Sequence, residues 1–281
     1  MILRFLRSNI GNILWFIVYF LISWQILGGT PDAFGIALLM YTISVVIALS
    51  FIGEAILRFS VGARPAQTKQ DKEYLIPLFE EVYQSAQEKC PKLSKCIKIY
   101  ITDSMMVNAF ATGRDTIVVT RGALSTFSRE QLKGVLAHEF GHLANGDTKA
   151  LLLNLVGNGF FTLGLIALKI VMFIVNFFIA MFDESGVFSI VMLLVTFVIN
   201  VYVFLFTTLG RLLLSADSRN AEKFADYFAY EIEYSEGLIE ALYLLQKTNF
   251  SGKVSIMERL TASHPHTTDR IARLEGLLEK E

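Results

Sequence analysis

Two histidines and a glutamate form the pattern in this sequence that points most directly to chemistry. His138 and His142 are four residues apart and Glu139 follows the first of them, which gives the motif H-E-x-x-H. On a helix, residues four apart lie on one face, so both imidazoles can reach a single zinc ion. Glu139 then lies beside the metal, where it can take a proton from a water molecule. The chain has only 4 histidines, so a chance match is not expected and the motif indicates zinc-dependent hydrolysis.

A catalytic zinc ion usually has three protein ligands and one open position, so a third ligand must come from elsewhere in the chain. The candidates are Glu222 and Asp226, which are four residues apart and would share one face of a helix. One carboxylate could bind the metal while the other accepts a hydrogen bond from a ligating imidazole. The spacing alone does not decide which residue has which role.

The composition is that of a membrane protein rather than of a soluble one. Hydrophobic residues make up 53% of the 281 residues, charged residues make up 18%, and the formal net charge is −1. A nearly neutral chain lacks the basic surface that a nucleic-acid partner requires. We therefore expect no nucleic acid as a partner, and we expect a lipid bilayer instead.

Four apolar segments are long enough to cross a bilayer, for which about 20 residues are needed. We expect the first to be a retained anchor and not a signal peptide, because no small-residue cleavage site follows it. Lys169 is the only charge inside the third segment, and its long side chain is expected to extend back to the headgroups. The four segments are Ile10–Gly28, Ala33–Gly53, Ala150–Phe182 and Val187–Gly210.

The charges beside these segments predict their orientation. Arg4 and Arg7 precede the first segment, Arg58 and Arg64 follow the second, and the two short connections are acidic or neutral. Since basic residues stay on the cytoplasmic side, both termini are expected in the cytoplasm and the chain in the inner membrane. The chain then divides into a transmembrane hairpin (1–57), a first catalytic part (58–149), a second transmembrane hairpin (150–210) and a second catalytic part (211–281).

The first catalytic part contains patterns of both helices and strands. Cys90 and Cys96 lie in a charged stretch without a second cysteine pair, so neither a structural zinc site nor a disulfide is expected. The predicted elements are a helix over Tyr74–Glu88, a strand over Ile97–Thr102, a hairpin of 108–112 with 116–120, and a motif helix that starts at Ser128 with Gln131 completing a capping box. The expected fold class is mainly α with a small β-sheet (α+β), in an integral membrane protein with four transmembrane helices and a cytosolic metalloprotease domain.

Connectivity brings the two catalytic parts together. The third and fourth apolar segments form a tight hairpin, so Asp147 and Arg211 must emerge close together on one side of the membrane. The segment after Arg211, which carries Glu222 and Asp226, is therefore expected beside the H-E-x-x-H helix.

Taken together, these motifs resemble those of the HtpX family, membrane-anchored zinc endopeptidases related to the Ste24 enzymes that process prenylated proteins. The resemblance covers nearly the whole chain and includes the four-segment layout. It rests on Gly62-Ala63-Arg64-Pro65, Asn108-Ala109-Phe110-Ala111-Thr112-Gly113, His138 to His142, Ser218 to Asp226, and Ser263-His264-Pro265.

The resemblance implies a role for each motif residue. His138, His142 and Glu222 would bind one zinc ion per subunit, and Glu139 would be the general base. Asp226 would support a ligand, and His264 would line the cleft and assist the transition state. The family degrades misfolded membrane proteins, which implies polypeptide substrates of that class and a role in quality control. His266 departs from the family pattern, which often has a second proline there, and we expect it at the surface.

A strand near Asn108, Ala109 and Phe110 is expected to bind the substrate in extended form through backbone hydrogen bonds. An intramembrane protease is excluded, because charged residues such as Arg129 and Lys149 flank the motif on both sides. Two alternatives stay open: a processing protease for one defined peptide, and a membrane scaffold or holdase that keeps the zinc without catalysis. The sequence does not predict the oligomeric state.

Overall fold

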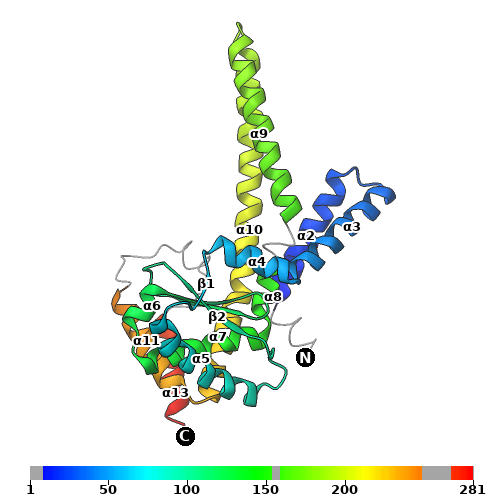
Figure 1. The fold of residues 1–281 in the computed structure, drawn as a ribbon. Coiled ribbons are helices and arrows are strands. Elements are labelled where there is room, and N and C mark those ends of the chain that lie inside the picture. The colour runs from blue at the N-terminus through cyan, green and yellow to red at the C-terminus, as the bar shows by residue number, and fades with distance from the viewer. Residues whose placement is uncertain (1–8, 154–158, 249–266, 281) are drawn as a thin grey trace.

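The computed structural model describes residues 9–153, 159–248 and 267–280, and most of them are helical. Figure 1 shows a compact body that contains one small sheet, from which two helical hairpins extend. The helices are α2 (Ile10–Ile26), α3 (Pro31–Ala48), α4 (Phe51–Ser60), α5 (Lys69–Lys89), α6 (Arg121–Thr126), α7 (Arg129–Asn145), α8 (Asp147–Leu152), α9 (Gly159–Phe182), α10 (Val187–Glu231), α11 (Ser235–Thr248) and α13 (Thr267–Leu278). The strands are β1 (Arg64–Pro65), β2 (Lys98–Thr102), β3 (Ala109–Thr112) and β4 (Thr116–Thr120). The prediction of a mainly helical fold with a small sheet is confirmed.

Among the described residues, three helices are long and apolar enough to cross a membrane. They are α3, residues 163–182 of α9 and residues 187–210 of α10, and the two segments in α9 and α10 are 0% buried within the protein. The helix α2 is equally apolar but has only 17 residues. Long apolar helices without a protein partner on most of their surface are expected only where lipid covers them.

The second and third apolar segments differ from their predicted bounds. The second was expected to run to Gly53, but α3 ends at Ala48 because the Ser50 hydroxyl accepts the Ile52 amide at 3.1 Å and starts α4. The third was expected to continue from a helix that begins at Asp147. The structure has α8 there, and residues 154–158 between α8 and α9 lie outside the described residues.

The sheet has the strand order β1-β2-β4-β3 and mixes parallel and antiparallel pairs. The predicted hairpin is confirmed: β3 pairs with β4 in antiparallel fashion, with Ala109 opposite Val119 and Thr112 opposite Thr116. The predicted strand 97–102 corresponds to β2, which is parallel to β4. Because β3 is the last strand of this order, its outer side forms one edge of the sheet.

The helices around the sheet are set by local caps and by apolar packing. The helix α5 begins five residues earlier than Tyr74, because the Thr68 hydroxyl accepts the Asp71 amide at 3.0 Å. The capping box predicted at Ser128 and Gln131 is present at the start of α7. Ten residues of α7 are buried, so this helix lies at the centre of the compact body that contains the sheet.

The helix α10 connects the apolar outer hairpin with the compact body. It runs without interruption for 45 residues, from the tip of the outer hairpin into the body (Figure 1). Its apolar half pairs with α9, and its last turns pack against α7. One continuous helix therefore carries residues from the apolar hairpin to the centre of the catalytic body.

Candidate metal centre

The helix α7 presents three polar side chains within an otherwise apolar core. His138 and Glu139 are each 6% exposed, and the rings of His138 and His142 stand almost perpendicular with their centroids 4.8 Å apart. The helix ends directly after them at Gly146, whose backbone is left-handed with φ 83°. The i, i+4 spacing thus places both imidazoles on one face, as expected from the sequence.

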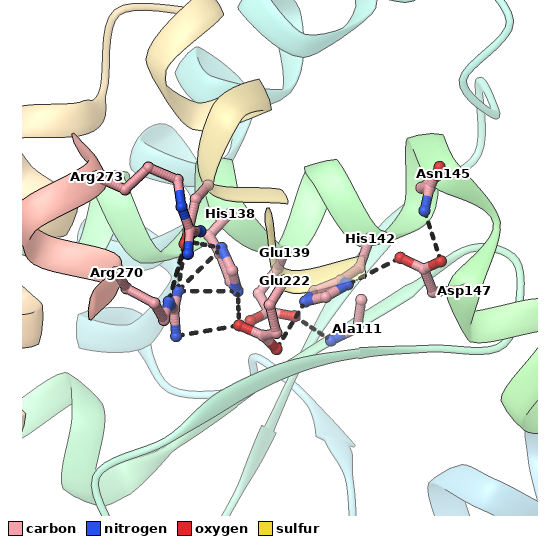
Figure 2. Close-up of polar contacts among 10 residues, drawn as sticks. Ala111, His138, Glu139, His142, Asn145, Asp147, Glu222, Arg270 and Arg273 are labelled. Atoms are coloured by element: carbon pink, nitrogen blue, oxygen red, sulfur yellow. Dashed lines mark hydrogen bonds and ion pairs between the residues drawn. The ribbon is translucent and has the colours of Figure 1, made fainter. Parts of the chain in front are cut away.

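The helix α10 brings Glu222 to the same place. Gly141, the residue between the motif's phenylalanine and its second histidine, makes this approach feasible: a Cβ there would lie 2.7 Å from the Cα of Ala225. Glu222, one turn before Ala225, lies with its two carboxylate oxygens 3.4 Å from Nε2 of His138 and 3.5 Å from Nε2 of His142 (Figure 2). Glu222 is 1% exposed, so this carboxylate is held inside the protein beside two imidazoles.

The donor set fits a tetrahedral zinc ion. One ligand atom from each of His138, His142 and Glu222 lies within 4.8 Å of the others. Zinc ligands at about 2.1 Å from the metal in tetrahedral geometry are separated by about 3.4 Å. Nε2 of His138 lies 3.4 Å from Oε2 of Glu222 and Nε2 of His142 lies 3.5 Å from Oε1, so each imidazole is close to that separation from one oxygen of the carboxylate. Two imidazoles and one carboxylate leave one of four positions open for a reacting group.

Both imidazoles are oriented by a second carboxylate. Nδ1 of His138 lies 3.1 Å from Oδ1 of Asp226, and Nδ1 of His142 lies 3.1 Å from Oδ2 of Asp147. A carboxylate at Nδ1 holds the proton on that nitrogen and leaves the lone pair of Nε2 free to bind a metal. The structure therefore places Asp226 where the resemblance implied. It adds Asp147, to which the sequence motifs gave no role at the site.

Two arginines of α13 complete the group of charges. Arg270 is 8% exposed; its guanidinium lies 2.6 Å from Asp226 and 3.1 Å from Glu222. Arg273 lies 3.6 Å from Asp226. Figure 2 shows both arginines on the His138 side of the site. The four carboxylates around the imidazoles, including Glu139, exceed these two guanidinium groups by two negative charges, which a divalent cation would balance.

The pKa of His142 shows the same excess of negative charge. Burial lowers the pKa of His142, but hydrogen bonds with Asp147 and Glu222 and the charge of Glu139 outweigh it and raise the pKa well above its usual value. Burial raises the pKa of Asp226, yet the hydrogen bond and charge of His138, together with Arg270, hold that pKa below its usual range. The site thus attracts positive charge, and a metal would bind there by displacing protons from the imidazoles.

Glu139 is fixed by the edge of the sheet. Its Oε2 accepts a hydrogen bond from the backbone amide of Ala111 in β3, at 2.6 Å and in a buried position. In an antiparallel pair, alternate residues turn their backbone groups away from the partner strand, so Ala109 and Ala111 face the outer edge of β3. The carboxylate of Glu139 and the edge of the strand therefore adjoin one another.

The other predicted residues have different outcomes. Ala109 and Phe110 lie in β3 and Asn108 directly precedes it, so the segment predicted to bind substrate lies at the sheet edge. A cavity of about 90 Å³ lies beside them; its polar lining residues are Asn108, His138, Glu139 and Arg270, and its other walls are apolar. His264 and His266 lie outside the described residues.

The comparisons with known proteins define the class of this chain: it is a membrane metalloprotease, a hydrolase of peptide bonds. The model of peptidase family M48 matches residues 69–278. The chain belongs to peptidase family M48, whose metallopeptidases are in general zinc-dependent, and within it is related to HtpX.

The similar proteins include several HtpX proteases. A protease HtpX homolog of Dictyoglomus thermophilum is 30% identical over 96% of this chain and 90% of its own length. Protease HtpX of Shewanella sp. is 32% identical over 70% of this chain and 72% of its own. Among solved structures, Ste24p of S. mikatae aligns with 17% identity and a TM-score of 0.47, covering 96% of this chain and 63% of that chain.

Proposed function

We propose that this protein is a membrane-bound zinc endopeptidase that faces the cytoplasm and hydrolyses misfolded or damaged membrane proteins as part of protein quality control. One observation carries the proposal: His138, His142 and Glu222 converge within 4.8 Å, with the carboxylate of Glu139 beside them. In this proposal the three residues bind one zinc ion per chain. The substrate class rests on the resemblance to the HtpX family and on the membrane character of the chain.

The proposed topology has four transmembrane segments and a catalytic domain in two pieces, with the divisions 1–57, 58–149, 150–210 and 211–281. Three long apolar helices support it, and so does the packing of α2 against α10, where the ring of Trp15 leaves no room for a side chain at Gly210. The basic residues that flank the first hairpin support a cytoplasmic active site in the inner membrane.

The chemistry divides among a few side chains. Zinc, when bound, supplies Lewis acidity that acidifies a water molecule and polarises the peptide carbonyl. Glu139 accepts the proton of the attacking water and returns it to the leaving amine, and the Ala111 amide holds this carboxylate in place. Asp226 and Asp147 keep the rings of His138 and His142 oriented. In this proposal His264 stabilises the oxyanion from the opposite side of the cleft.

The substrate is proposed to bind along β3. An extended segment that pairs with the outer edge near Asn108, Ala109 and Phe110 would place a peptide carbonyl next to Glu139, because Ala111 of the same strand contacts that residue. Pairing through the backbone gives little sequence preference, as removal of damaged proteins requires. The adjoining cavity of about 90 Å³ would accept one apolar side chain.

The decisive experiment replaces the proposed base while keeping the metal. Glu139→Gln retains an oxygen that can accept the Ala111 amide, but it cannot take a proton. We expect the purified variant to keep one zinc ion and to lose hydrolysis of unfolded casein by about 10²–10⁴-fold. Metal analysis and a casein assay on the same preparation measure both quantities.

Glu130→Gln is the matched control, because Glu130 lies on the same helix and its side chain is 69% exposed. This variant should cleave casein as the wild type does, and a chelator should abolish that activity until zinc is restored. A zinc-loaded wild type that does not cleave casein would favour the holdase. A Glu139→Gln variant with full turnover would exclude this residue as the base.

A further inference from the structure

Glu54 is a buried acidic residue to which the proposed chemistry gives no role. It is 9% exposed and lies in the first turn of α4, directly after the apolar helix α3. Figure 1 shows α4 between the α2–α3 hairpin and the catalytic body. A buried carboxylate is costly unless it is paired and hydrogen-bonded, so its partners indicate why it is there.

Its partners are at the tip of the β3–β4 hairpin. Oε1 of Glu54 accepts the backbone amides of Arg114 at 2.5 Å and Asp115 at 3.1 Å. Gly113 fits closely against the same side chain: its φ is +67°, and a Cβ there would lie 2.6 Å from Cγ of Glu54. The carboxylate therefore caps the turn, as anions do where successive backbone amides point in one direction.

A second set of contacts fixes α4 to the sheet. Arg58 pairs with Glu54 at 3.2 Å, donates to the Thr116 hydroxyl at 3.3 Å and lies over the ring of Tyr100. Past the end of the helix, the Val61 carbonyl accepts the Thr102 hydroxyl at 2.8 Å. The polar side of α4 and the residue after it are thus bonded to two strands, β2 and β4, whereas among the described contacts of α4 it is Glu54 that reaches the turn between β3 and β4.

The turn is close to the catalytic site along the chain. β3 has only four residues, and Ala111, which donates to Glu139, lies two residues before Gly113. At the other end, the Asn108 carbonyl accepts the Thr120 amide at 3.0 Å. So short a strand is positioned by its two ends, and Glu54 holds the end nearer to Ala111.

The opposite side of α4 is apolar and open. The exposed fractions are 79% for Phe51, 45% for Ile52, 47% for Ile56 and 91% for Phe59. A helix with this pattern that directly follows an apolar helix of membrane length is suited to lie along the bilayer surface. Its polar side then faces the sheet, so α4 lies between the bilayer and β3.

We propose that Glu54 is a positioning residue for substrate binding: it ties the tip of the β3–β4 hairpin to α4 and so sets where the substrate-binding edge of β3 lies relative to the membrane anchor. This inference rests on the proposed function, since it assumes that substrate pairs with β3. The first membrane hairpin would then contribute to peptide binding in addition to anchoring the protein.

The test measures KM and kcat separately with the full-length protein in lipid nanodiscs and a quenched fluorescent peptide. Glu54→Ala should raise KM about tenfold, as expected when a charged hydrogen-bond acceptor is lost, while zinc content stays at the wild-type value and kcat changes less than KM. Glu54→Gln should recover part of the loss, because its amide oxygen can still accept both backbone amides. Gly113→Ala disturbs the same contact from the hairpin side and should also raise KM.

Glu73→Ala is the matched control, because Glu73 belongs to an i, i+4 pair with Lys69 like that of Glu54 with Arg58, but its side chain is 68% exposed. Its KM should equal that of the wild type. An unchanged KM in Glu54→Ala would overturn the proposal. So would a variant in which KM stays constant and kcat falls only in proportion to the fraction of folded protein. If Glu54→Ala does not fold, Glu54→Gln and Gly113→Ala are judged by the same KM criterion.

Hydrogen exchange provides a readout that does not depend on activity. Amides 109–112 should exchange about tenfold faster in Glu54→Ala than in the wild type, while those of α7 stay unchanged. If the wild type holds zinc but cleaves nothing, the proposed function fails while this measurement still tests the contact between Glu54 and β3. Equal exchange in β3 of both proteins would overturn the positioning role.

Discussion

The two halves of α10 show how one helix is specified by two different surroundings. In residues 187–210, half-buried positions recur every three or four residues, and large apolar side chains cover the rest of the surface. These half-buried residues are Ser189, Met192, Thr196, Ile199, Val203 and Phe206, which Thr207 and Thr208 follow; Thr196 contacts Asn176 of α9, and Phe206 packs against Trp15 of α2. After residue 218 the buried positions of α10 are small or charged except for Phe228, and they are Ala221, Glu222, Ala225, Asp226, Phe228 and Ala229.

The two halves of α10 differ in the contacts that their side chains must make. The apolar half needs only a hydrophobic outer surface, so many residues are equivalent there and composition alone reveals it. In the catalytic half, small residues let the backbone approach α7, and each buried carboxylate needs a specific partner. Function should therefore be far more sensitive to substitution in the second half than in the first.

The largest effect is expected at Glu222. Glu222→Ala removes one of three metal ligands and leaves two imidazoles, so the variant should lose its zinc on purification and show only the activity of the chelator-treated wild type. Metal analysis by mass spectrometry together with the casein assay measures this. Glu231→Ala is the control from the same helix, since its partner Lys89 lies 2.9 Å away at the surface. A zinc-replete Glu222→Ala protein would remove Glu222 from the proposed ligands.

The sequence predicted the elements that local patterns specify. The capping box at Ser128 and Gln131, the β3–β4 hairpin and the apolar segments were all recognisable from spacing and turn residues. The short strand β1 and the single-turn helix α6 were not predicted. Each has too few residues to show a period, and their positions depend on contacts far along the chain.

The sequence predicted those residues of the candidate site that belong to a motif or that the connectivity of the apolar hairpin brings together. The hairpin argument placed Glu222 beside the H-E-x-x-H helix, and the structure brings them together. Asp147 and Arg270 were missed as contacts of the histidine rings. Asp147 lies after a glycine, where a helix cap explains it fully, and a buried arginine has the same sequence signature as an exposed one. For Asp147 a signal existed: it is five residues after His142, just beyond the end of the helix.

The next effect concerns the two carboxylates that orient the imidazoles, one on the catalytic half of α10 and one at the start of α8. Asp226, on the catalytic half of α10, is 1% exposed and also pairs with Arg270, whereas Asp147 is 14% exposed outside that helix. Asp226→Asn and Asp147→Asn keep the shape but remove the charge at Nδ1. We expect zinc affinity to fall about 10–100-fold in both, and more in Asp226→Asn because its site is drier.

Competition with a chromophoric chelator measures both affinities. Asp103→Asn is the control, because the side chain of Asp103 is 65% exposed and its contacts with Arg64 and Arg121 are at the surface. If both variants bind zinc as tightly as the wild type, the carboxylates have no part in orienting the rings. A larger loss in Asp147→Asn than in Asp226→Asn would show that burial on α10 does not determine the effect.

The smallest effect is expected in the apolar half, where one polar contact joins the two helices of the hairpin. Nδ2 of Asn176 in α9 donates to the Thr196 hydroxyl in α10 at 3.1 Å. Thr196→Val removes this bond, and hydrogen bonds between membrane helices contribute on the order of 0.6 kcal/mol, so thermal stability in lipid should fall slightly while casein turnover stays within about twofold. Thr207→Val is matched to it, since Thr207 donates only within its own helix, to the Phe204 carbonyl. A loss of turnover in Thr196→Val as large as that in Asp226→Asn would mean that register within the hairpin controls the position of Glu222, and the two halves of α10 would then be one functional unit.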